Sequence, residues 1–110
     1  MRGERERLLD ILEAIERIEK YAQEGRSTFE SDELIQTWIV HHITIIGEAC
    51  RSLSGDFQAQ HANVPWADIV GMRNILVHQY FGIDTDAVWG VVENDIPDLK
   101  ENIQTILRDF

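Results

Sequence analysis

The first part of the chain repeats apolar residues at every third or fourth position, which is the period of one face of an α-helix. Charged side chains such as Glu13 and Arg17 occupy the opposite face. The apolar positions are Leu8, Ile11, Leu12, Ile15, Ile18 and Ala22. This pattern predicts an amphipathic helix that ends at Gly25, because glycine commonly follows the last turn of a helix.

A second helix is predicted to begin near Ser31, since serine is a common N-terminal cap and the next two residues are acidic. The helical pattern continues to about Leu53, so we place this helix at residues 32–53. The run Ile43-Thr44-Ile45-Ile46 is rich in β-branched residues, but no turn signal interrupts the pattern before Ser54-Gly55. We therefore interpret the whole segment as helical.

This second helix is apolar around most of its circumference rather than along one stripe. Its apolar positions are Leu34, Ile35, Trp38, Ile39, Val40, Ile43, Ile45, Ile46, Ala49 and Cys50. In a chain of 110 residues, we expect such a helix to contact the bundle core and a second subunit as well. The pattern thus predicts a homodimer built on the second and third helices.

The rest of the chain indicates further helices joined by short connections. Residues 54–64 are predicted to form a loop with at most one short turn, and Pro65 suits the first turn of a third helix that stops at Gly82. Asp84 is a suitable cap for a fourth helix, with Ile83 packing on Val88, and Pro97 opens or kinks the last one. With no strand candidate, the predicted fold is all-α, an antiparallel bundle of four to five helices in one domain over residues 1–110.

Composition limits the function classes. Twenty acidic residues against ten basic ones give a formal net charge of −10, which argues against a general affinity for DNA or anionic membranes. The single cysteine cannot form an intramolecular disulfide, and no apolar run approaches the ~18 residues of a membrane span or the core of a signal peptide. We expect a cytoplasmic protein whose contacts with nucleic acid are local.

Several chemical motifs are absent from the sequence, namely a glycine-rich phosphate loop, a Cys-x-x-Cys pair and a His-Glu-x-x-His helix. We therefore expect no metal and no cofactor. His41 and His42 would point about 100° apart on a helix, so we interpret them as core or interface residues rather than joint metal ligands. We expect His61 to be solvated in its loop and Cys50 to be an inert buried thiol.

The most informative segment is Met72 to Tyr80, because it contains a conspicuous arginine. From position 56 onward, Arg73 is one of three basic residues among nine acidic ones. On a straight helix Arg73 and His78 would leave about 140° apart, while Asn74 and His78 would share a face and Tyr80 would return to the side of Arg73. Two copies related by a two-fold axis could bring both pairs into one cleft.

These two side chains suit the cleavage of RNA. His78, predicted near a helix C-terminus, would favour the protonated form, and Arg73 offers a planar donor pair for a phosphate. Histidine could assist attack by a 2′-hydroxyl while arginine stabilises the charge on phosphorus. From spacing alone the alternative remains a capping histidine with a surface arginine that pairs with Asp68 or Glu48.

The segment Arg73-Asn74-Ile75-Leu76-Val77-His78-Gln79-Tyr80 resembles the Arg-x4-6-His motif of the HEPN family, in the Arg-x4-His-x-Tyr form of the HepT type of bacterial toxin. The resemblance extends to Ile46-Gly47-Glu48-Ala49, to Pro65-Trp66 and to Ile96-Pro97-Asp98-Leu99. These landmarks are spread over nearly the whole chain, so the match is specific as a set.

The resemblance implies an all-helical homodimer whose paired motifs form a metal-independent endoribonuclease site, acting as the toxin of a type VII-like toxin–antitoxin module. It also implies a partner, a minimal nucleotidyltransferase of the MntA type, which neutralises the toxin by transferring AMP from ATP to the motif tyrosine. By position, Arg73 and His78 would be catalytic, Asn74 would support them and Tyr80 would accept the AMP.

A second function class stays open at this point. In it the protein is a non-catalytic HEPN module whose Arg73 and His78 bind a nucleotide or fix the dimer, and which serves as a docking partner of the nucleotidyltransferase. The net charge of −10 also leaves open how RNA would be held. Arg51, on the same predicted helix as Glu48, is one candidate for additional positive charge near the cleft.

Overall fold

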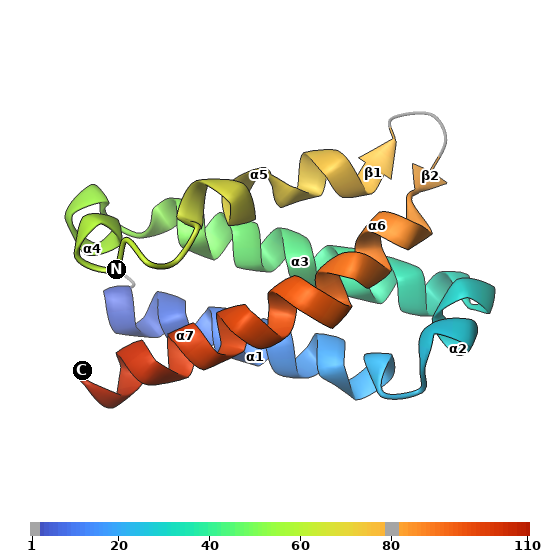
Figure 1. Ribbon diagram of the computed structural model, residues 1–110, viewed down its shortest axis with the longest axis horizontal. Helices are drawn as coiled ribbons and strands as arrows, with labels where there is room; N and C mark the ends of the chain where they lie inside the picture. Colours follow the sequence, from blue (N-terminus) through green and yellow to red (C-terminus); the bar gives the residue numbers. More distant parts are fainter. Residues whose placement is uncertain (1–2, 79–81) are drawn as a thin grey trace.

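The computed structural model describes the backbone of residues 3–78 and 82–110, and the side chains of these residues except 73 and 75–78. Four longer helices dominate the molecule and run along its 40 Å length (Figure 1). They are α1 (Glu4–Ala22), α3 (Glu33–Ser52), α5 (Trp66–Leu76) and α7 (Ile96–Arg108). The predicted helical bundle is confirmed in its main elements. No helix in this described part is both long enough and apolar enough to cross a membrane.

A short helix, α2 (Arg26–Ser31), lies between the first two long helices and was not predicted. Gly25 precedes it with a φ of 94°, a conformation that glycine adopts at little cost. Ser31 belongs to α2 and its hydroxyl donates to the Thr28 carbonyl. The cap of α3 is instead Asp32, whose carboxylate accepts from the backbone N–H groups of Leu34 and Ile35. The expectation that Ser31 begins the second long helix is therefore one residue off.

The predicted loop at residues 54–64 contains a second short helix, α4 (Gly55–Gln60). Ser54 caps it by accepting from the Phe57 N–H group. The buried Phe57 ring anchors α4 to the core, and the indole N–H of Trp66 donates to the His61 carbonyl. The connection is thus more ordered than its polar sequence predicted, because two aromatic side chains attach it to the bundle.

The third long helix, α5, ends at Leu76, so the predicted continuation to Gly82 is wrong. Val77–His78 forms strand β1, which pairs antiparallel with β2 (Gly82–Ile83) in the register Val77 to Ile83 and His78 to Gly82. Gly82 has a φ of 81°, which suits a tight reversal. The ladder replaces the last helical turn, so the expectation of no strand is also wrong.

The last part of the chain is one continuous helical path from α6 (Thr85–Gly90) through the π-helical segment η1 (Val91–Asp95) into α7 (Figure 1). Asp84 caps α6 by accepting from the Ala87 N–H group, as predicted. Pro97 lies in the first turn of α7 and has no N–H group for the Glu93 carbonyl. The turn before it widens, and the Ile96 N–H donates five residues back to Val91.

The core is centred on α3, which packs between α1 and α5, while α7 packs on α1. Large side chains with almost no exposure are Leu8, Ile11, Ile15, Ile18, Phe29, Ile39, Ile43, Ile46, Val88 and Ile103. The apolar circumference of α3 is therefore used largely within one subunit, by helices on two sides. The homodimer stays a prediction, and its original reason applies only to the remaining exposed strip of α3.

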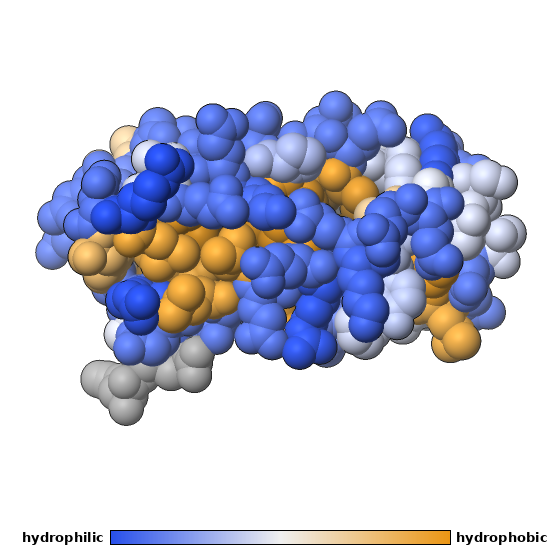
Figure 2. Space-filling view, turned by 90° about the horizontal axis from the view of Figure 1, so that it is seen from below, coloured by the Kyte–Doolittle hydropathy of each residue, from blue (hydrophilic) through white to orange (hydrophobic). Residues whose placement is uncertain are grey.

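The face seen in Figure 2 is mostly hydrophilic, with one apolar region that extends from the left end to the middle and a smaller apolar patch near the right end. Leu9 of α1 and Phe110 at the chain end are exposed to 38% and 58%.

Candidate functional site

The structure places the predicted site residues on two elements. Arg73 and Asn74 lie in the last turns of α5, and Asn74 is exposed. His78 lies two residues beyond the helix end, in β1. Because the two motif residues are not on one straight helix, the predicted 140° separation, the shared face of Asn74 and His78, and the helix-end position of His78 do not apply. Tyr80 lies outside the described residues.

A cavity of about 310 Å³ lies beside this segment, between α3 and α5. Asn74, the one motif residue whose side chain is described, is exposed and forms part of its lining. From α3 it is lined by Ile43, Thr44, Gly47, Glu48 and Arg51, and from α5 by Ile69, Val70, Gly71 and Asn74. We refer to it as the α3–α5 cavity.

Gly47 lines this cavity where α3 packs against the backbone of α5. A Cβ atom built on Gly47 would lie 3.5 Å from the Ile69 carbonyl oxygen and 3.6 Å from that of Val70. These are ordinary contact distances, so alanine would fit, whereas a longer side chain would meet the α5 backbone. Position 47 therefore tolerates a side chain no larger than that of alanine without a shift of α3 against α5.

Arg51 supplies positive charge to the α3–α5 cavity. It is exposed on α3, one turn after Glu48, and no carboxylate of the described residues forms an ion pair with it. An arginine without a carboxylate partner keeps its donors available for an anion such as a phosphate. The structure therefore brings Arg51 and Asn74 to one cavity. The alternative prediction, that Arg73 pairs with Asp68 or Glu48, falls on a side chain outside the described ones.

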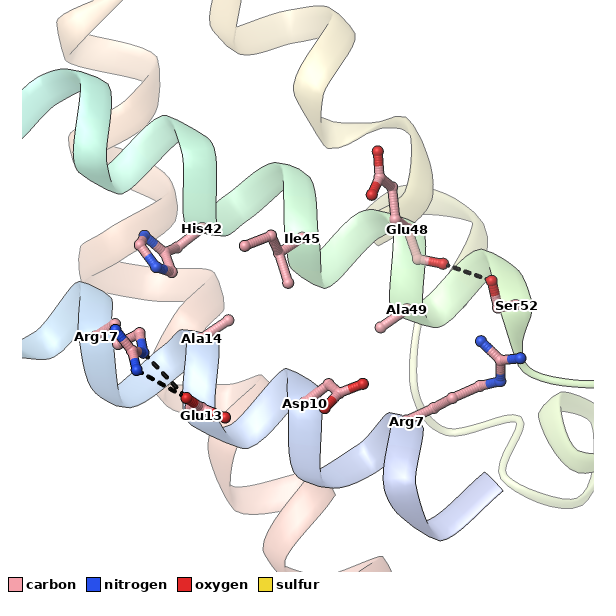
Figure 3. Close-up of a pocket in the computed structure, with 10 residues that line it drawn as sticks. All are labelled: Arg7, Asp10, Glu13, Ala14, Arg17, His42, Ile45, Glu48, Ala49 and Ser52. Atoms are coloured by element: carbon pink, nitrogen blue, oxygen red, sulfur yellow. Dashed lines mark hydrogen bonds and ion pairs between the residues drawn. The ribbon is translucent and has the colours of Figure 1, made fainter. Parts of the chain in front are cut away.

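A second cavity, of about 530 Å³, lies between α1 and α3 (Figure 3). Arg7, Asp10, Glu13 and Arg17 line it from α1, and His42, Glu48 and Ser52 from α3. Arg17 is bound to Glu13 at 2.9 Å. Sequence analysis did not identify this site, although alternating basic and acidic residues at helical spacing along α1 were its signal. Its lining mixes both signs of charge.

His42 points into this region but has a structural role (Figure 3). Its Nδ1 atom lies 2.7 Å from the Trp38 carbonyl oxygen, and the two rings are 4.5 Å apart. His42 is buried whereas His41 is exposed, so the interpretation as a core residue is confirmed for His42 alone. Among the described residues, no cluster of three or more histidine, cysteine or acidic side chains could hold a metal ion.

Two further residues complete the set of sequence-based candidates. Cys50 is fully buried, and burial raises the pKa of its thiol to about 12, so it stays protonated and unreactive, as predicted. His61 is half-buried, with its ring 4.6 Å from that of Phe57. The expectation that His61 is simply solvated is wrong, because α4 folds the loop back onto the core.

Comparison with known proteins supports the classification of the chain. Residues 11–106 match the family model described as "Ribonuclease HepT-like". The chain is 37% identical over 108 residues to the "Probable ribonuclease HepT" of Thermococcus cleftensis, which covers 97% of this chain and 98% of that protein. It is 36% identical over 100 residues to "Putative RNase MJ1380" of Methanocaldococcus jannaschii, covering 90% and 92% of the two chains.

A third relative is longer. It is the "Gamma-glutamylcyclotransferase and putative RNase MJ0434" of Methanocaldococcus jannaschii, 39% identical over 101 residues that make up 91% of this chain but 46% of that protein. No solved structure matches the chain significantly. The helical bundle, the motif segment beside the α3–α5 cavity and these matches lead to one conclusion. The chain belongs to the HepT-like ribonuclease family.

Proposed function

We propose that this protein is an endoribonuclease that cleaves RNA without a metal ion, through a composite site formed by Arg73 and His78 from two subunits. The observation that carries the proposal is the position of the motif segment in a chain of this family. The segment runs from the end of α5 into β1, beside a cavity lined by Asn74 and the unpaired Arg51. A composite site requires a homodimer in which the α3–α5 faces of two subunits meet.

The proposed reaction is an internal transfer on the RNA backbone. The 2′-oxygen forms a bond to phosphorus while the bond from phosphorus to the 5′-oxygen breaks. One copy of His78 accepts the proton of the 2′-hydroxyl, and the other donates a proton to the leaving 5′-oxygen. Arg73 stabilises the negative charge that develops on the phosphoryl oxygens. The products are a 2′,3′-cyclic phosphate and a free 5′-hydroxyl.

We further propose the biological setting that the family resemblance implies. In it the protein is the cytoplasmic toxin of a type VII-like toxin–antitoxin module, and a minimal nucleotidyltransferase of the MntA type silences it by AMPylation of Tyr80. Each AMP brings one negative charge and a bulky nucleoside to the motif segment. Both would compete with a substrate phosphate for the arginine donors, so inhibition needs no unfolding.

The central test is replacement of the two motif residues. Arg73→Ala and His78→Ala should each abolish toxicity and lower RNA cleavage by roughly 10² to 10⁴-fold, while helical content and dimerisation stay unchanged. Cleavage is followed on purified RNA with and without a chelator, which should make no difference. Arg108→Ala is the matched control, since Arg108 is exposed on α7 and, in the described part of the chain, its guanidinium bonds only within that helix.

Full activity of both motif variants would contradict the assignment of catalytic roles. If the unmodified wild-type protein cleaves no RNA but binds the nucleotidyltransferase or a nucleotide, the non-catalytic module is the correct function class. One cleavage assay and one binding assay on the same preparation therefore distinguish the ribonuclease from the non-catalytic module.

Replacement of the motif tyrosine tests the mode of neutralisation. Tyr80→Phe should retain ribonuclease activity but escape inhibition by the nucleotidyltransferase with ATP, because the acceptor oxygen is gone. Intact-mass spectrometry should show addition of AMP to the wild type and none to the variant. Tyr21→Phe is the control, as Tyr21 is half-buried with its ring 5.3 Å from that of Trp38. ATP-dependent neutralisation of Tyr80→Phe, or an adduct on Tyr21, would contradict this placement.

A further inference from the structure

A third cavity, of about 650 Å³, is lined by residues of α5 and of the α6–η1–α7 path, with two residues of α3. Its interior is apolar, formed by side chains of α3, α5, η1 and α7 that belong to the bundle core. These are Ile43, Ile46, Ile69, Met72, Val91, Ile96 and Leu99. Ile43 and Ile69 also line the α3–α5 cavity, so α5 lies between the two spaces. We call this space the acidic groove because of its rim.

Four carboxylates form that rim: Asp68, Asp95, Asp98 and Glu101, all exposed. No lysine or arginine lines the groove among the described residues, and none of these carboxylates has an ion pair there. Asp68 and Asp98 lie in first helical turns, where a negative charge also complements the helix dipole. Asp95 makes no capping hydrogen bond, and Glu101 lies beyond the first turn of α7.

Two effects act on the pKa of Asp95, and the repulsion from the neighbouring carboxylate is the smaller of them. Burial, with added repulsion from Asp98, raises the pKa of the Asp95 carboxyl. A cationic group placed between these two side chains would remove the repulsion and favour the charged form.

The negative charge of the rim limits which molecules can bind in the acidic groove. RNA and nucleotides are anionic and would be repelled by the rim. A second copy of this chain, placed symmetrically on the same groove, would bring its own carboxylates against these. An apolar floor with an acidic rim instead matches a helix that has apolar residues on one face and lysine or arginine beside them.

We propose that the acidic groove is a docking site for a basic amphipathic helix of a protein partner. The apolar face of the helix covers Met72, Ile69 and Leu99, and its basic residues pair with Asp95, Asp98 and Glu101. This inference does not rest on the proposed ribonuclease activity, because it is argued from the described lining of the groove and not from Arg73 or His78.

The test uses a short helical peptide of leucine and lysine with its leucines on one face, titrated into the full chain and followed by amide chemical shifts. The peptide should perturb groove residues such as Ala87, Leu99 and Asn102. A variant with Asp95→Asn, Asp98→Asn and Glu101→Gln should bind it roughly tenfold more weakly, since three exposed charge pairs are lost. A control with Glu16→Gln, Glu24→Gln and Asp109→Asn has the same change in net charge and should bind as the wild type does.

Three peptide and ligand comparisons complete the test. Glutamate in place of lysine, or serine in place of leucine, should abolish binding. Equal loss of affinity in both charge variants, shifts located outside the groove, or no binding to the wild type would overturn the proposal. Spermidine producing the same shifts with similar affinity would also overturn it in favour of a polyamine site.

Discussion

At the scale of single residues, Arg51 is the side chain that we expect to bind an anionic substrate in this acidic chain. The net charge of −10 repels RNA at long range, so affinity must come from a few local contacts. Arg51 is exposed in the α3–α5 cavity with Asn74 and is not neutralised by a carboxylate of the described residues. We therefore propose that Arg51 binds a backbone phosphate next to the one that is cleaved.

We predict that Arg51→Gln raises KM for RNA roughly tenfold with little change in kcat, as expected for the loss of one charged hydrogen bond to a phosphate away from the reacting bond. The slope of log affinity against log salt concentration should fall by about one. Steady-state cleavage and anisotropy titrations measure both. Arg108→Gln should leave KM unchanged, and an unaltered KM in Arg51→Gln would exclude Arg51 from substrate binding.

At the scale of elements, local capping decides where α3 begins. Asp32 and Ser31 are adjacent and both are good capping residue types, but only Asp32 accepts from free N–H groups of the helix, at 2.9 Å from Leu34 N and 3.3 Å from Ile35 N. Ser31 is the last residue of α2, and its hydroxyl donates to the Thr28 carbonyl instead. We therefore expect Asp32 to contribute more to the free energy of unfolding than Ser31, although both are common capping residues.

We predict that Asp32→Ala lowers the free energy of unfolding by about 1 kcal/mol, which corresponds to a fall in Tm of roughly 4–8 °C for a domain of this size. Ser31→Ala should lower it by much less, because its hydroxyl bonds a single exposed carbonyl. Thermal unfolding followed by circular dichroism compares the two. A larger effect at Ser31 than at Asp32 would mean that α3 is capped as the sequence pattern alone predicts.

At the scale of the whole molecule, the proposed composite site requires two subunits. A half-buried strip of α3, which includes Val40 and Thr44, is the surface that we propose for the contact with a second subunit. We predict a particle of about twice 12.7 kDa by light scattering or sedimentation. A strict monomer at micromolar concentration would contradict both the dimer and the composite site.

A pair of threonine variants locates this interface. Thr44→Glu should shift the protein towards monomer and reduce cleavage, because it adds a charge to the centre of the proposed contact. Thr105→Glu is the matched control, since both threonine hydroxyls donate four residues back to a carbonyl, Thr44 to Val40 and Thr105 to Glu101. If the two variants change the mass of the particle in solution equally, the interface lies elsewhere.

The sequence by itself determined the positions of the long helices, since the period of apolar residues records which face of each helix is buried. It also located the motif at Arg73 and His78, and the Asp84 cap, because these depend on neighbouring residues. Tertiary structure decided the rest. Pairing of Val77–His78 with Gly82–Ile83 ended α5 at Leu76, and helix periodicity contains no information about hydrogen bonds to another segment. Packing of α1 and α5 on two sides of α3 likewise decided how much apolar surface of α3 remained exposed. It also decided where the three cavities lie.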